Sequence, residues 1–271
     1  MSTIRLAVVG AGNMAQAILR GAFDTGVLTP QETLVADPAE AQRSTLASWG
    51  ANVTPTAASF AGAIASDTQI MLAVKPQFLA EAAQDLGSAA DNRVIISILA
   101  GSTSERIRDV VGGNARIVRT MPNLPARIRK GITAVALGAG AVDGDDDFAQ
   151  SLFRAVGEVI SIDESLMDAF TGIAGSGPAY VFYLAEAMCK AGVRMGFSEA
   201  EALGIVRATI DGAATLLAQS DDDPAALRAA VTSKKGTTDA AITSLDQSGV
   251  MAAVEQAAIA ARDRGAELAA M

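Results

Sequence analysis

A glycine-rich turn near the N-terminus carries the strongest chemical signal in the sequence. Gly10, Gly12 and Ala15 follow an apolar run and open a helical pattern, in the spacing Gly-x-Gly-x-x-Gly/Ala. The first glycine permits a tight turn, the second lets backbone amides approach a pyrophosphate, and the third small residue allows close helix–strand packing. The N–H groups of the helix start, at Asn13 and Met14, would face the phosphates. The turn therefore predicts a dinucleotide site rather than an ordinary glycine-rich turn.

An acidic residue stands where the second strand should end. Asp37 follows the short run 33–36. A carboxylate there can accept a hydrogen bond from a ribose 2′-OH and would repel a 2′-phosphate, which favours NADH. Arg43 lies in the following helical stretch, and loop residues could still accommodate NADPH. The predicted cofactor is thus NADPH or NADH, with the preference open.

Other loops follow predicted strands at the same edge of the sheet, where ligands bind in open α/β folds. Lys75 could face a cofactor phosphate or ribose, or it could lie in solvent. Asn123, between two prolines, could fix a nicotinamide carboxamide or a substrate, or stabilise its own turn. Beyond the glycine turn, the predicted cofactor residues are Asp37, Ala73, Val74, Lys75, Pro76, Ala100 and Asn123.

Two junctions in the second half could bind a small anion. The sequence Gly-Ser-Gly-Pro at 175–178 opens a helix with proline at its first position. The stretch 231–238 offers Ser and Thr hydroxyls, free amides, and the cations Lys234 and Lys235 just before another helix. A small carboxylate would find its donors there. The alternative is an N-cap turn with both lysines in water.

The elements that position these loops fall into two halves. Up to residue 162 apolar runs alternate with helical stretches, which predicts a parallel sheet covered on both faces. Strands are expected at 4–9, 33–36, 69–74, 94–99, 116–119, 132–136 and 159–162. From 163 only helices are expected, at 165–172, 178–191, 198–218, 224–232, 238–245 and 251–268. We therefore predict an α/β domain at 1–162 and an all-α domain at 163–271.

Local signals refine the helical half. Ser198 and Glu201 form the pattern of a capping box, and Asp143–Asp147 is expected to be a solvated loop or cap. Many of the helices are rich in alanine and apolar on more than one face. Such helices usually bury the extra face against a second subunit.

Composition excludes several classes of function. The 271 residues carry 21 Lys and Arg against 30 Asp and Glu, a net charge of −9, which argues against nucleic acid as a main partner. Histidine is absent, and Cys189 is the one cysteine, so we expect no metal site, no His-based triad and no internal disulfide. No apolar run reaches the roughly 18 residues of a membrane span, and the N-terminus lacks a signal-peptide pattern. We expect a cytoplasmic protein without a membrane partner.

Five motifs in order give the chain a resemblance to a known family. They are Gly-Ala-Gly-Asn-Met-Ala at 10–15, Ala-Val-Lys-Pro at 73–76, Met-Pro-Asn-Leu-Pro at 121–125, Gly-Ser-Gly-Pro-Ala-Tyr at 175–180 and Thr-Ser-x-x-Gly-Thr-Thr at 232–238. Together they resemble the pyrroline-5-carboxylate reductases over nearly the whole chain. The resemblance implies a Rossmann domain and a helical dimerisation domain, with dimers assembling into rings. It implies hydride transfer from NAD(P)H to the C=N carbon of 1-pyrroline-5-carboxylate, giving L-proline.

The resemblance also implies roles for single residues. The amides of Gly236 and Thr237 would hold the substrate carboxylate, and the catalytic Thr238 hydroxyl would lie near the ring nitrogen. The implied substrate-binding residues are Glu164, Ser233, Gly236, Thr237 and Thr238. The chain departs from the family at Lys235, where glycine is usual, and at Lys234, where proline is frequent.

Two other functions remain open on the sequence alone. One is a related oxidoreductase acting on a small hydroxy acid. It would need a Lys or His acid/base, and the helical half has only Lys190, Lys234 and Lys235. The other is a protein that senses a dinucleotide without catalysis.

Overall fold

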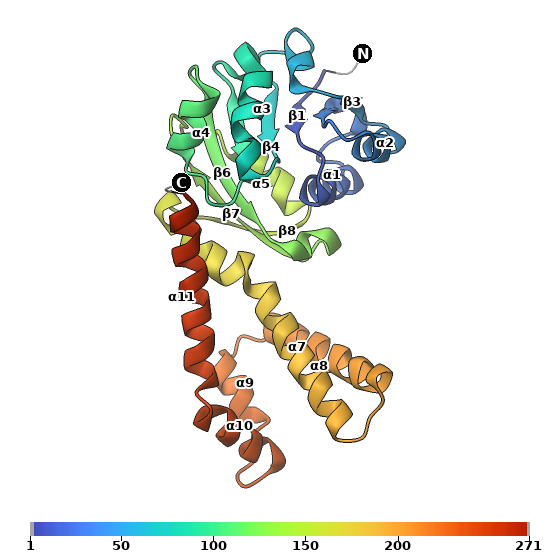
Figure 1. Ribbon diagram of the computed structural model, residues 1–271, viewed down its shortest axis with the longest axis vertical. Coiled ribbons are helices and arrows are strands. Elements are labelled where there is room, and N and C mark those ends of the chain that lie inside the picture. Colours follow the sequence, from blue (N-terminus) through green and yellow to red (C-terminus); the bar gives the residue numbers. More distant parts are fainter. Residues whose placement is uncertain (1–2, 270–271) are drawn as a thin grey trace. The chain divides into compact units, whose positions relative to one another are not determined.

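Residues 3–269 are described by a computed structural model and form two compact units (Figure 1). The first unit runs to Ser176 and includes the chain again from Ala260, and the second is Gly177–Ile259. The sequence places its boundary earlier, after residue 162. The first unit extends further because Met167, just beyond that point, is buried against Ala134 and Ala136 of the sheet.

An eight-stranded sheet forms the centre of the first unit, in the order β3-β2-β1-β4-β5-β6-β7-β8. β1 lies between β2 and β4, so the strand order reverses there and opens a crevice at the carboxyl ends of the strands. The strands are β1 (Leu6–Val9), β2 (Thr33–Ala36), β3 (Asn52–Thr54), β4 (Gln69–Leu72), β5 (Val94–Ser97), β6 (Arg116–Pro122), β7 (Gly131–Leu137) and β8 (Gly157–Ser161).

The sheet is parallel, as predicted, except at one pair, where β7 runs antiparallel to β6. The connection at 123–130 is a short 3-10 turn, and a parallel return needs a crossover of about a dozen residues or more. The sequence also missed β3, which is short and only partly buried. The other seven strands lie where they were predicted, with ends shifted by a few residues.

Helices cover both faces of the sheet, as predicted. Leu6 and Val8 face a core formed with α1 and α5, whereas Ala7 and Val9 face a core formed with α3 and α4. This alternation along β1 is the period of two that a strand buried on both faces requires. The helices of this unit are α1 (Asn13–Thr25), α2 (Glu40–Ser48), α3 (Leu79–Leu86), α4 (Ser104–Val111), α5 (Asp147–Arg154) and α6 (Met167–Phe170).

One acidic residue that was expected in solvent is buried. The Asp145 side chain is 8% exposed and lies 2.7 Å from the Arg116 guanidinium. It also accepts a hydrogen bond from the backbone of Val142 at 2.9 Å. The buried Asp145 therefore stabilises its own loop. The run of acidic residues in the sequence did not reveal this role.

The second unit is helical throughout. It contains α7 (Gly177–Arg194), α8 (Glu199–Gln219), α9 (Pro224–Ala230), α10 (Thr237–Gln247) and the first part of α11 (Val250–Ala269). α7 and α8 approach closely at Gly192, where an added Cβ would lie 3.0 Å from that of Ala202. Many apolar side chains of these helices are exposed, among them Phe182, Tyr183, Leu184, Leu216, Leu217 and Met251.

The predicted capping box begins α8. Ser198 Oγ accepts from the Glu201 backbone at 3.3 Å, and Glu201 Oε2 accepts from the Ser198 backbone at 2.9 Å. The bonds from the Ser198 side chain and backbone lower the pKa of Glu201. Within residues 3–269, no helix is both long and apolar enough to cross a membrane.

Candidate active site

The glycine-rich turn joins β1 to α1 at the crevice of the sheet. Gly10 has φ +99°, and a Cβ there would lie 2.7 Å from the carbonyl oxygen of Ala73, so the position needs glycine. Gly12 is the N-cap of α1, and a Cβ there would meet nothing within 4 Å. The two glycines thus differ in function. Gly10 lets the turn approach β4, whereas Gly12 leaves open space in front of the helix N-terminus.

Asp37, at the end of β2, holds this turn in place. Its Oδ2 accepts a hydrogen bond from the Ala11 backbone at 2.7 Å, and its Oδ1 accepts one from the Ala39 backbone at 2.8 Å. The carboxylate therefore ties the turn after β1 to the turn after β2. The sequence signal for Asp37 was its place after a strand, and its bond to Ala11 was not foreseen.

A cavity of about 340 Å³ opens beside these residues. It brings together six of the predicted cofactor residues, namely Gly10, Gly12, Asp37, Ala73, Val74 and Lys75. Sequence reasoning missed its other walls, which are Val9, Ala36, Pro38, Pro55, Thr56, Ala57, Phe78, Glu81, Ala82 and Asp85. Phe78, Glu81, Ala82 and Asp85 follow helical spacing, so the periodicity of the stretch after Lys75 could have revealed them.

The remaining predicted cofactor residues lie outside the walls of this cavity. Ala15 is buried in the core beneath α1, where a small residue allows close packing. Pro76 begins the 3-10 turn before α3, and Ala100 is exposed after β5. Asn13 and Met14 form the first turn of α1, whose N-cap Gly12 has no side chain to accept their N–H groups. An open cradle, free helix-start amides and an adjoining cavity fit a dinucleotide.

The side chain of Asn123, just after β6, is hydrogen-bonded to the backbone. Its side chain is 8% exposed, donates to the carbonyl of Ala174 at 3.0 Å and accepts from the backbone of Ile132 at 3.0 Å. Both polar atoms of the amide are thus bonded to backbone. Of the roles considered from the sequence, this geometry favours stabilisation of the local chain.

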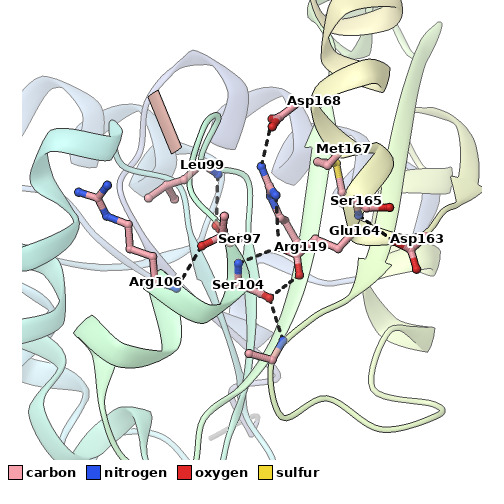
Figure 2. Close-up of polar contacts among 12 residues, drawn as sticks. Ser97, Leu99, Ser104, Arg106, Arg119, Asp163, Glu164, Ser165, Met167 and Asp168 are labelled. Carbon is pink, nitrogen blue, oxygen red and sulfur yellow. Dashed lines mark hydrogen bonds and ion pairs between the residues drawn. The ribbon is translucent and has the colours of Figure 1, made fainter. Parts of the chain in front are cut away.

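Glu164 belongs to a partly buried polar network centred on Arg119 of β6 (Figure 2). Arg119, 4% exposed, lies 3.2 Å from Glu164 and 3.6 Å from Asp168. Glu164 also accepts bonds from the backbone, at 2.8 Å, and from the hydroxyl of Ser104, the first residue of α4. The network joins β6, α4 and α6. α11 passes close to it, since a Cβ on Gly265 would lie 3.1 Å from Asp168.

The predicted substrate loop lies in the second unit, between α9 and α10. Gly236 is the N-cap of α10, and its N–H donates to the carbonyl of Ser233 at 2.9 Å. One of the two amides expected to hold a carboxylate is therefore used within the turn. Thr237 and Thr238 begin α10 and carry first-turn amides that Gly236, lacking a side chain, does not cap. Thr237 is exposed and Thr238 half-buried.

Lys235 keeps a backbone that suits glycine. Its φ is +59°, in the left-handed region, and its N–H donates to Asp239 Oδ2 at 2.9 Å. Since this hydrogen bond is made by the backbone, it does not require a particular side chain at position 235.

Replacing Lys235 by glycine should raise the free energy of unfolding by about 0.5–1 kcal/mol, because a left-handed residue with a side chain is strained. Lys235→Ala is the matched control, since alanine removes the charge and keeps the strain. Denaturant unfolding of the three proteins measures the effect. Equal stabilities for the glycine and alanine variants would contradict it.

The parallel-dominated sheet, its glycine cradle and the helical unit that follows define a class, the Rossmann-type dinucleotide oxidoreductases with a second, helical domain. Residues 164–268 match the family model described as pyrroline-5-carboxylate reductase dimerisation, and residues 5–101 match the model described as NADP oxidoreductase coenzyme F420-dependent. The chain belongs to the pyrroline-5-carboxylate reductase family, as its similarity to named members also shows.

Relatives and solved structures match the chain almost end to end. A pyrroline-5-carboxylate reductase of Pseudomonas aeruginosa is 39% identical, with 99% of this chain and 98% of the relative covered. That of Arabidopsis thaliana is 34% identical, covering 98% and 96%. The solved structure of a pyrroline-5-carboxylate reductase from Coxiella burnetii has a TM-score of 0.88 at 29% sequence identity. The match covers 98% of this chain and 99% of that one. The structure of pyrroline carboxylate reductase from Plasmodium falciparum, solved with NADP bound, has a TM-score of 0.87 at 25% sequence identity. The match covers 99% of both chains.

Proposed function

We propose that this chain reduces the C=N bond of 1-pyrroline-5-carboxylate to L-proline, with hydride from NADH or NADPH. The observation that carries the proposal is the match to reductases of this name over 98–99% of the chain. The cavity beside the glycine turn supports it, because its walls suit the adenosine half of a dinucleotide.

The chemistry suits a chain without histidine. When bound, the nicotinamide supplies the hydride to the imine carbon, and a cyclic imine can enter already protonated on nitrogen. The protein then contributes mainly by positioning the two reactants and excluding water. In this proposal the 232–238 loop holds the carboxylate, with the Ser233 hydroxyl nearby, and Thr238 orients the ring nitrogen.

The ring nitrogen needs a proton donor other than Thr238, because the threonine hydroxyl is too weak an acid to donate a proton efficiently. Two carboxylic acids, Glu164 and Asp221, are the candidate proton donors. Glu164 accepts bonds from Ser104 and faces the Arg119 guanidinium, so it is committed as an acceptor. This favours a substrate that arrives protonated, or Asp221, as the source.

We further propose a cytoplasmic homodimer formed through the helical domain, with dimers assembled into a ring. The exposed apolar side chains of α7, α8 and α11 support it, because monomeric proteins rarely leave so many uncovered. Light scattering coupled to size-exclusion chromatography measures the mass. A monomer at micromolar concentration would contradict the proposal.

Turnover of pyrroline-5-carboxylate tests the activity directly. Oxidation of NADH and of NADPH, followed at 340 nm in parallel, should depend on the imine and yield L-proline. A dinucleotide sensor would bind the cofactor and leave the imine unreduced. An oxidoreductase for hydroxy acids would instead reduce 2-keto acids under the same conditions.

A further inference from the structure

The carboxylate of Asp37 is fixed in orientation at the wall of the cavity. Its two oxygens accept from Ala11 and Ala39 at 2.7 and 2.8 Å, and it lines the cavity together with Pro38. Each carboxylate oxygen can accept a second bond, so Asp37 can still bind a hydroxyl. The Ala11 and Ala39 donors therefore hold the carboxylate in place at this wall.

The rest of the cavity is acidic as well. Glu81 and Asp85 of α3 also line the cavity, and Asp85 accepts a hydrogen bond from the Thr56 hydroxyl on the neighbouring loop. Lys75 is the one cation among the described lining residues, against three carboxylates. A ligand group carrying close to two further negative charges would therefore meet net repulsion.

Arg43 is the basic residue nearest to Asp37 in the sequence. In the structure its guanidinium is hydrogen-bonded to backbone carbonyls. Its Nη1 donates to the backbone carbonyls of Asp37 and Pro38, at 2.7 Å each. Arg43 is not among the described residues that line the cavity. Its bonds stabilise the turn between β2 and α2, so they hold Asp37 in place rather than offering a phosphate clamp.

We infer that this chain selects NADH over NADPH, with Asp37 as the specificity-determining residue. The carboxylate accepts a hydrogen bond from the ribose 2′-OH of NADH and repels the 2′-phosphate of NADPH. The inference rests on the part of the proposed function that concerns the dinucleotide. It does not depend on the imine, because every residue in the argument lies in the first unit.

Binding of ADP-ribose and 2′-phospho-ADP-ribose, measured by calorimetry on the full chain, isolates this contact. The two probes differ only in the 2′-phosphate and need no reaction. ADP-ribose should bind about tenfold to a hundredfold more tightly, and the ratio of the two Kd values should shrink as salt screens the repulsion. Equal affinities would overturn the inference.

Asp37→Asn removes the charge and keeps one of the two oxygen acceptors. It should lower the ratio of Kd values by about tenfold. The ratio is the useful quantity because any slackening of the glycine turn weakens both probes alike. Asp67→Asn makes the same change of charge on an exposed loop away from the cavity and should leave the ratio unchanged. An unchanged ratio in Asp37→Asn would overturn the role of Asp37.

These measurements distinguish failure of the inference about NADH from failure of the proposed reductase activity. If the ratio holds while pyrroline-5-carboxylate is not reduced, the inference stands and the proposed activity falls. If both probes bind equally well and the imine is reduced, only the inference falls. If neither probe binds, the dinucleotide site and the inference fall together.

Discussion

Replacing Arg119 by methionine should lower the free energy of unfolding by about 2–4 kcal/mol, because the change removes one cation from two carboxylates. Arg119 is 4% exposed, whereas Glu164 and Asp168 are each 24% exposed, so water offsets part of the loss. Methionine keeps much of the apolar stem that packs in β6. The effect should appear as a lower denaturant midpoint with an unchanged slope.

Two further variants separate electrostatics from packing. Adding Glu164→Gln and Asp168→Asn to Arg119→Met should recover a large part of the lost stability, since no uncompensated charge is then buried. Lys190→Met is the surface control, because Lys190 and Glu186 form an exposed pair at 2.6 Å and such pairs contribute little. A stable Arg119→Met protein would show that the network does not hold α4 and α6 on the sheet.

The Arg119 network also shows where the sequence stops being informative. Apolar runs located seven of the eight strands, and the spacing of Ser198 and Glu201 located the start of α8. Those signals are local, since strand period and capping act within a few residues. The bonds of Arg119 to Glu164 and Asp168 join residues far apart in the chain, and no spacing rule encodes them.

The same limit explains two residues whose hydrogen-bond partners could not be predicted. Asn123 was expected to face a ligand or to stabilise its own turn, and its partners Ala174 and Ile132 were not deducible from the sequence. Glu164 was assigned to the pocket by resemblance, and its bonds to Ser104 appear only in the folded unit. At Lys235, where glycine is usual in the family, the backbone is left-handed with φ +59°, although the residue carries a side chain.

Replacing Thr238 by alanine should lower kcat/KM for pyrroline-5-carboxylate by about tenfold to a thousandfold, which is the loss of one or a few oriented hydrogen bonds. Thr238 is the second residue of α10 and is half-buried. The substitution leaves its backbone amide in place, so it removes only the hydroxyl proposed to orient the ring nitrogen. Steady-state turnover measures the change, and Thr238→Ser should retain most of the activity.

A matched control and a nitrogen-free probe separate orientation of the substrate from damage to the loop. Thr243→Ala makes the same change at an exposed position of α10 and should leave kcat/KM unaltered. Cyclopentanecarboxylate keeps the carboxylate and lacks the ring nitrogen, so it should inhibit the wild type and Thr238→Ala equally. Weaker inhibition of the variant would place the fault in carboxylate binding. Undiminished turnover would remove Thr238 from the mechanism and leave positioning to the amides at the start of α10, because they are the donors that the substitution does not touch.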